Sequence, residues 1–375
     1  MSFAVEPADL DGYAKLLFRA SEDAGAGIDY MQKNCKLEAA AGDIWQLIFT
    51  PHSEHMHDAK KCLEAFQRVL DASSDELKKS AKYYLSTDEE QARKVDATYP
   101  QSKPHRSGDA KAAKGPSSSF ADKADASSRL KAPGGEDSYV ADWLAEAGQH
   151  PGEKIAGTLL DLASPSAMVL EFIKIMTGWD PLGDFLSWIA GDWESYLECA
   201  EVWGCLADLC GEISQNVKAG NIELDATWQG NSADSAYVYF DEAGGKLLEL
   251  QETFTSLQDN YSRISGAVYA FAEFLKGLIV QVLDLGLNAL LKKIAGDAAL
   301  AAGPLGATVA APLYAMVAAD ILRITKKWGD AMQMVDKVMK VVSAGAGVIE
   351  GTLAGTVKSV SDFPVPGKGY DNRAA

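Results

Sequence analysis

The chain lacks the residues and motifs on which most enzyme chemistry depends. Its 375 residues include five histidines, and none of them lies in the C-terminal half. No GxSxG, Walker or HExxH motif occurs, and no pair of carboxylates stands apart from the many acidic residues. Because general acid–base and nucleophilic catalysis need such groups in a defined arrangement, the sequence predicts a protein that is not an enzyme and needs no cofactor.

Basic residues are also scarce. Lys and Arg number 35 against 53 Asp and Glu, which gives a formal net charge of −18. Phosphate binding needs a dense basic face, so nucleic acid is not expected as a partner, and simple electrostatic docking on anionic lipid is disfavoured. The first residues, Met1 to Glu6, contain neither a basic nor an apolar signal region, so no cleaved signal peptide is predicted.

The cysteines are few and lack the spacing of a metal site. None of the five forms a CxxC pair, so a zinc or thioredoxin-type site has no support. Cys35 and Cys62 flank the first predicted turn, where either a disulfide or two buried free thiols would fit. His52 and His55 share a helical face, as metal-ligating pairs do, whereas His57 points elsewhere. Exposed polar residues are ordinary at the start of a helix, and no metal is expected.

What the chain does contain is apolar residues spaced for helices, with no convincing strand. Steps of three and four place side chains on one helical face, and sustained stripes of this kind pack against partner helices. The stripes form two pairs, each joined by a short turn, at 10–35 with 56–84 and at 196–217 with 240–275. We therefore predict an all-α fold of long antiparallel hairpins, forming a four-helix-bundle-like assembly with extra C-terminal helices.

The two predicted turns differ in sequence. The first spans Ala41 to Trp45 and is closed by Pro51, and the second is Trp228-Gln229-Gly230. A glycine allows a tight turn, which the first turn lacks at the corresponding position, since it reads Trp45-Gln46-Leu47. The first hairpin is therefore expected to bend more loosely than the second.

Composition divides the chain into four parts. A run of Ser, Ala, Lys, Gly and Pro with few large apolar side chains predicts a flexible linker, followed by a Trp-rich entry at 137–192. This entry is expected to pad the base of the second hairpin, with a ligand-binding aromatic cage as the alternative. The predicted parts are the N-terminal hairpin at 1–100, the linker at 101–136, a helical domain at 137–362 and a disordered tail at 363–375.

An uncharged run covers residues 298–319. It is long enough to cross a bilayer, which takes about 20 residues, but Gly303-Pro304 and Pro312 interrupt it. A buried helix–turn–helix is the expectation here, and a membrane-spanning segment is the alternative.

Two motifs together resemble the Trp-x-Gly superfamily of type VII (ESX) secretion substrates. Trp228-Gln229-Gly230 lies between two helical stripes, as the family's turn does, and Tyr84-Leu85-Ser86-Thr87-Asp88 fits its Tyr-x-x-x-Asp/Glu export signal. The first hairpin also resembles the small ESX secretion-associated proteins of actinobacteria. A second match, Tyr237 to Asp241, falls within a helix and is not expected to act as a signal. Thr87 and Glu90 also fit a capping box for a short following helix.

The resemblance implies an export role for named residues. Tyr84 and Asp88 would be the secretion signal, and Trp228, Gly230 and Trp45 would be turn residues. The protein would be secreted or on the cell surface without a cleaved signal peptide. Its partners would be the secretion machinery with its membrane ATPase, and a small helical protein or a second copy of itself. The alternatives are a membrane-active or pore-forming effector that uses the apolar 278–319 region, and a carrier for a separate toxin.

Overall fold

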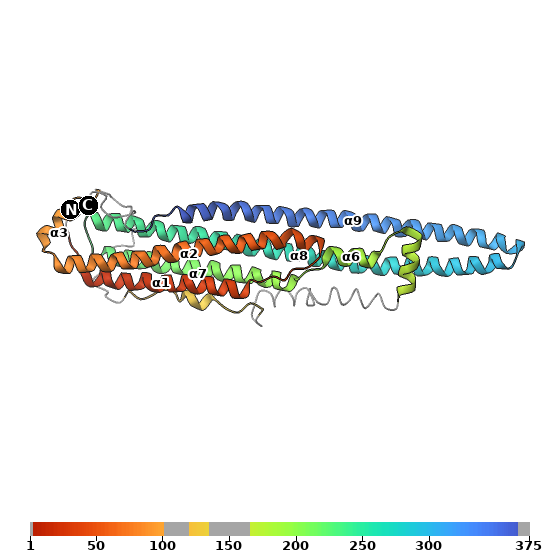
Figure 1. Ribbon diagram of the computed structural model, residues 1–375, viewed down its shortest axis with the longest axis horizontal. Helices are drawn as coiled ribbons and strands as arrows, with labels where there is room; N and C mark the ends of the chain where they lie inside the picture. Colours follow the sequence, from red (N-terminus) through yellow and green to blue (C-terminus); the bar gives the residue numbers. More distant parts are fainter. Residues whose placement is uncertain (1–2, 101–119, 135–165, 367–375) are drawn as a thin grey trace.

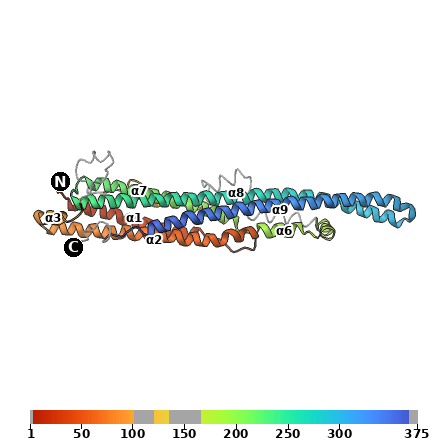
Figure 2. The ribbon, with the colours of Figure 1, turned by 90° about the horizontal axis from the view of Figure 1, so that it is seen from above.

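The computed structural model describes residues 3–100, 120–134 and 166–366 as a long bundle of helices (Figures 1 and 2). Within these ranges there is no strand, only an isolated bridge between Ala4 and Gln229, which confirms the all-α class. The elements are α1 (Pro7–Asn34), α2 (Asp43–Ser86), α3 (Glu89–Asp96), the 3-10 turn η2 (Ala126–Arg129), a helix at 166–177, α6 (Pro181–Ile189), α7 (Trp193–Asp225), α8 (Asn231–Ala301) and α9 (Pro304–Ser361).

Five long helices form a closed ring around a shared core. Helix α1 packs against α2 and α7, α8 packs against α7 and α9, and α9 also packs against α2. The two predicted hairpins, α1–α2 and α7–α8, therefore lie together in one chain, and α9 closes the ring between α2 and α8. The apolar face of α9, which includes Ile324, Val335 and Val342, is buried. Helix α9 is thus one of five helices that enclose the core, and it does not simply lie outside a four-helix bundle.

The first turn begins and ends earlier than the sequence suggested. Helix α2 begins at Asp43, so Trp45 lies in its first turn and Pro51 lies inside the helix. An internal proline removes a backbone hydrogen bond to the carbonyl four residues earlier. Burial of Ile44, Trp45 and Ile48 offsets this loss, because each large apolar side chain removed from water contributes about 1.5–3 kcal/mol.

Part of the predicted flexible linker is ordered. Phe120 is buried, with its ring 6.0 Å from that of Tyr13. The buried amide of Asn216 on α7 accepts hydrogen bonds from the backbone N–H groups of residues 123 and 124 and donates one to the carbonyl of residue 124. These contacts hold the start of the segment, and the hydrogen bond from the Tyr30 hydroxyl to the carbonyl of residue 131 and the ion pair between Arg129 and Glu212 hold its later part against α1 and α7. The other residues of the predicted linker lie outside the described ranges.

Two tryptophans of the predicted entry, Trp179 and Trp188, are buried against α9, a helix outside the second hairpin, and Trp143 lies outside the described residues. The rings of Trp179 and Trp188 lie 4.9 Å and 5.7 Å from that of Trp328 on α9. An open cavity of about 170 Å³ lies beside Trp179. Trp179 and Trp328 both line this cavity, together with Asp184.

The uncharged run forms a helix–turn–helix, but it is exposed rather than buried. Gly303, with a φ of 97°, joins α8 to α9, and Figure 1 shows this hairpin extending past the other helices. Leu300 is 53% exposed and Leu305 is 88% exposed, whereas Ala310 is buried and Val317 packs in a small apolar cluster with Phe172 and Ala289. The expectation of burial was wrong for most of the run, because beyond Val317, toward the turn, no described helix other than α8 and α9 covers it. Both α8 and α9 contain stretches long and apolar enough to cross a membrane.

The first residues of the tail that was predicted to be disordered are ordered. The ring of Phe363 lies 5.2 Å from that of Tyr239, whose hydroxyl donates a hydrogen bond of 2.8 Å to the carbonyl of Pro364. The chain is therefore fixed against α8 just beyond the end of α9. Residues 367–375 lie outside the described ranges.

Candidate functional site

The Trp-x-Gly triplet forms the tight turn between α7 and α8. Gly230 has a φ of 140° and a ψ of −175°, a conformation that is strained for any residue with a side chain. A Cβ atom at this position would lie 2.6 Å from the carboxylate of Asp96. Glycine is therefore required here for both its backbone conformation and its lack of a side chain.

Asp96 caps the N-terminus of α8 from the other hairpin. Its carboxylate accepts hydrogen bonds from the backbone N–H groups of Asn231 (3.0 Å) and Ser232 (2.9 Å), and from the Ser232 hydroxyl (2.8 Å). Gly230, at the N-cap position, has no side chain to do this. A buried carboxylate at a helix N-terminus satisfies free N–H groups and complements the helix dipole.

Sequence analysis missed Asp96. One feature could have indicated its role. Asp96 is the last residue of α3, and a negative charge is unfavourable at the C-terminus of its own helix. The residue is more favourable at the N-terminus of a different helix, which is where the fold places it.

Tyr84 lies against the same turn. Its ring centroid is 6.5 Å from that of Trp228, at an angle of 69°, and its hydroxyl is 3.3 Å from the hydroxyl of Ser232. Trp228 is buried and Tyr84 is half-buried. Burial raises the pKa of the Tyr84 hydroxyl, which therefore stays protonated and able to donate. The structure thus brings the candidate signal tyrosine and the turn tryptophan together from two hairpins.

The N-terminal segment lies across this turn. Ala4 exchanges two backbone hydrogen bonds with Gln229, of 3.1 Å and 2.8 Å, and the N–H of Glu6 donates to the carbonyl of Thr227. The ring of Phe3 lies 6.1 Å from that of Tyr84. Residues 3–6, Tyr84, Asp96 and Trp228–Ser232 together form one end of the bundle, which we call the turn end.

The other predicted signal and turn residues lie elsewhere. Asp88 is exposed and caps α3 by accepting a hydrogen bond of 2.9 Å from the N–H of Gln91. The predicted capping box is therefore wrong, because Asp88, not Thr87, is the cap. Trp45 lies at the far end of α2, about 60 Å from Tyr84 at ~1.5 Å per residue. It belongs to the opposite end of the bundle.

A group of buried polar side chains links the two hairpins nearer the middle of the bundle. Nδ1 of His52 and Nδ1 of His55, on α2, lie 2.9 Å and 3.1 Å from the hydroxyl of Tyr261 on α8. Nε2 of His52 lies 3.1 Å from the carbonyl oxygen of Cys35. Burial lowers the pKa of each histidine to about 4. Both rings are therefore neutral at pH 7.

Of the two possibilities for Cys35 and Cys62, the structure shows free thiols and not a disulfide, since all five cysteines are free. Cys35 lies beside His52, and Cys62 is ten residues farther along α2, or about 15 Å at ~1.5 Å per residue. That separation is too long for a disulfide. The neighbour of the Cys35 thiol is Cys199 on α7. No local sequence pattern indicates this pair, because the two residues lie on different hairpins.

No protein-family model, no curated protein and no solved structure matches the chain. Its function is therefore argued from its own residues and their geometry.

Proposed function

We propose that the chain is a substrate of a type VII (ESX) secretion system, exported in folded form without enzymatic activity, and acting outside the cell through helical protein–protein contacts. The observation that carries the proposal is the contact between Tyr84 and Trp228 at the turn end. In the family that the motifs resemble, the export machinery reads a Trp-x-Gly turn on one partner together with a tyrosine signal on the other. Here both parts meet in one polypeptide.

The packing of the two hairpins supports the same proposal. Helix α1 lies against α7, and the buried hydroxyl of Tyr13 donates a hydrogen bond of 2.9 Å to the carbonyl of Val217. Asp96 at the end of the first hairpin caps the second. Because buried polar groups need partners, these contacts favour one paired arrangement. The first hairpin then supplies the signal and the second hairpin serves as its helical partner.

Export is expected to depend on the side chains of Tyr84 and Asp88. Tyr84→Ala should leave the protein inside an actinobacterial host that carries the secretion system, because both the aromatic signal and its contact with Trp228 are lost. Asp88→Asn should do the same, since asparagine can still cap α3 but carries no charge. The measurement is the fraction of the full chain in the culture filtrate, by immunoblot.

Two controls separate the signal from general damage. Tyr83→Ala removes the neighbouring tyrosine, which is 37% exposed, and Asp241→Ala removes the exposed acid of the second Tyr-x-x-x-Asp match. Both variants should be exported as the natural chain is. Export of Tyr84→Ala at the natural level, with the protein folded by circular dichroism, would refute the signal assignment.

A membrane-active effector is the second candidate, and a specific observation favours it. The α8–α9 tip, defined as residues 294–316, exposes a row of apolar side chains that no described helix covers: Ile294, Leu300, Leu305, Val309 and Met316. The run from residue 298 to 319 carries no charge. Such a surface favours contact with lipid.

The geometry limits how deep the tip would enter. The arm of α9 from residue 304 to 319 is about 24 Å long at ~1.5 Å per residue, which is less than the hydrocarbon core of about 30 Å. On α8, Lys292, Lys293 and Asp297 are charged close to the turn. The tip therefore fits insertion into one leaflet better than a complete span.

Dye release from liposomes tests this second candidate. The natural chain at micromolar concentration should release dye, and Leu305→Glu with Val309→Glu should reduce release at least about tenfold, since each buried leucine contributes about 2 kcal/mol. Leu85→Glu is the matched control, because Leu85 is 76% exposed near the turn end. No release by the natural chain would remove the candidate.

A further inference from the structure

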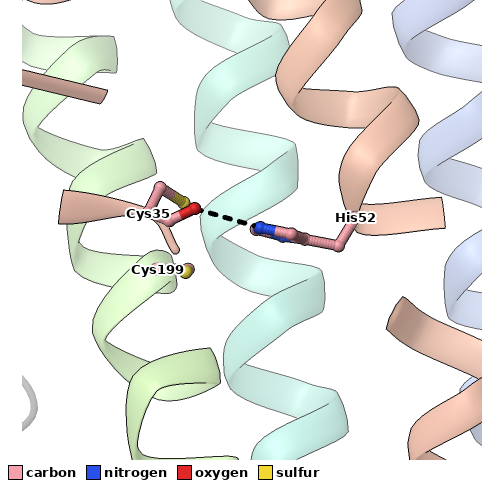
Figure 3. A group of neighbouring side chains, drawn as sticks. All are labelled: Cys35, His52 and Cys199. Atoms are coloured by element: carbon pink, nitrogen blue, oxygen red, sulfur yellow. Dashed lines mark hydrogen bonds between the residues drawn. The ribbon is translucent and has the colours of Figure 1, made fainter. Parts of the chain in front are cut away.

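Three soft donor groups meet in the bundle core, and no side chain that the family resemblance singles out is among them. The thiols of Cys35 and Cys199 and a ring nitrogen of His52 all lie within 4.8 Å of one another, and all three residues are buried. Figure 3 shows the ring of His52 pointing toward Cys35, with the sulfur of Cys199 beside it. Each donor comes from a different segment: Cys35 is the C-cap of α1, His52 lies on α2 and Cys199 lies on α7.

The nitrogen that faces the thiols is identified by the hydrogen bonds. The carbonyl of Cys35 can only accept, so Nε2 of His52, 3.1 Å away, carries the proton in the structure as it stands. Nδ1 then accepts from the Tyr261 hydroxyl at 2.9 Å. Nε2 is therefore the nitrogen that could bind an ion, and the hydrogen bond between Nδ1 and Tyr261 fixes the orientation of the ring.

Tyr261 is suited to support such a ligand. A metal-binding histidine usually hydrogen-bonds a polar group through its other nitrogen, which fixes the ring. The Tyr261 hydroxyl can accept as well as donate. With an ion bound at Nε2 and the proton of His52 on Nδ1, it can accept a hydrogen bond from that Nδ1–H and donate its own to Nδ1 of His55, 3.1 Å away. The ring of Tyr261 is itself fixed by stacking at 4.4 Å on Tyr196.

We infer that Cys35, Cys199 and His52 form a site for one Zn²⁺ ion, which joins the two hairpins through the core. Two cysteine sulfurs and one histidine nitrogen are ligands that zinc prefers. Two thiolates balance the charge of the ion, so a neutral group is buried, whereas a monovalent ion would leave a net negative charge in the core. The inference does not depend on export.

The required movements are small. In a tetrahedral zinc site with bonds of about 2.0–2.3 Å, the donor atoms lie about 3.5–3.8 Å apart. The three donors are already within 4.8 Å, so each has to approach by roughly 1 Å or less. Both thiols release their protons to solvent on binding. His52 loses the proton on Nε2 and takes one up at Nδ1, so the ring stays neutral, and no electrons are transferred. The described side chains supply three ligands, which leaves one position for water.

Zinc titration of the full chain tests the inference. The protein is reduced with a phosphine, stripped of metal and titrated with Zn²⁺ under nitrogen, and bound zinc is counted by native mass spectrometry. We expect one ion per chain and a higher thermal midpoint. Cys199→Ala should weaken binding more than about 100-fold and Tyr261→Phe about 10–100-fold, the range for groups that orient a ligand.

Cys210→Ala is the matched control. Cys210 is also fully buried on α7, about 16 Å farther along at ~1.5 Å per residue, so it loses similar packing and should bind zinc as the natural chain does. Because a variant can fail to fold, the natural chain is also loaded with Co²⁺, whose thiolate charge-transfer band reports sulfur ligands directly. No bound zinc, equal binding by Cys199→Ala and Cys210→Ala, or a Cys35–Cys199 disulfide that persists after reduction would each overturn the inference.

Discussion

Replacing Gly230 by alanine is expected to destabilise the bundle by roughly 3–6 kcal/mol. The backbone conformation alone, with φ at 140°, costs a residue with a side chain about 1–3 kcal/mol. The new Cβ atom would also lie 2.6 Å from the Asp96 carboxylate. Moving that carboxylate away weakens its hydrogen bonds to the N-terminus of α8, and hydrogen bonds to charged groups contribute about 1.5–3 kcal/mol each. Urea unfolding followed by circular dichroism measures the loss.

Gly277→Ala is the control on the same helix. Gly277 is exposed, and a Cβ atom there meets no atom within 4 Å, so this variant should be more stable by about 0.5–1 kcal/mol. A double-mutant cycle with Asp96→Ala measures the energy of the clash between the new Cβ atom and the Asp96 carboxylate. Gly230→Ala should be less destabilising when that carboxylate is absent. Equal stability of the two glycine variants would show that the turn does not need the conformation described here.

The parts of the fold that the sequence predicted are those set by local periodicity. The stripes ending at Cys35 and starting at Tyr196 predicted α1 and α7, because a long repeat of three and four specifies a helix without reference to its partner. The turn at Trp228 followed from the gap between two such stripes. Asp96 and Cys199 were missed for the converse reason, since their partners lie on another hairpin and no local pattern records that contact.

Two expectations were wrong because they inferred order or burial from the average composition of a segment. Residues 120–134 look unable to form a core, yet Phe120 enters the core, and hydrogen bonds and ion pairs to α1 and α7 hold the rest of the segment. Residues 298–319 look like a core segment, yet most of them are exposed, because α8 and α9 cover only each other's facing side at this end. An average over a segment cannot foresee either result, because burial depends on which partner is present.

Trp45→Ala is expected to destabilise the opposite end of the bundle by about 3–5 kcal/mol, the range for removing a buried tryptophan. Trp45 is fully buried, and its ring meets that of Trp193 edge-on at 5.0 Å and lies 6.3 Å from Tyr196. Its indole N–H donates a hydrogen bond of 3.1 Å to the carbonyl of Glu38. The substitution therefore leaves a large cavity between the first hairpin and α7, which urea unfolding should record.

Two further variants show whether that loss comes from packing between the hairpins. Trp45→Phe keeps an aromatic ring and should be less destabilised than Trp45→Ala, while Leu85→Ala, on the exposed surface near the turn end, should change stability by no more than about 0.5 kcal/mol. Because the two hairpins meet at both ends, through Trp45 at one and through Asp96 and Tyr84 at the other, unfolding should remain a single transition. A loss below about 1 kcal/mol for Trp45→Ala, or two separate transitions in the natural chain, would mean that Trp45 does not join the two hairpins into one cooperative unit.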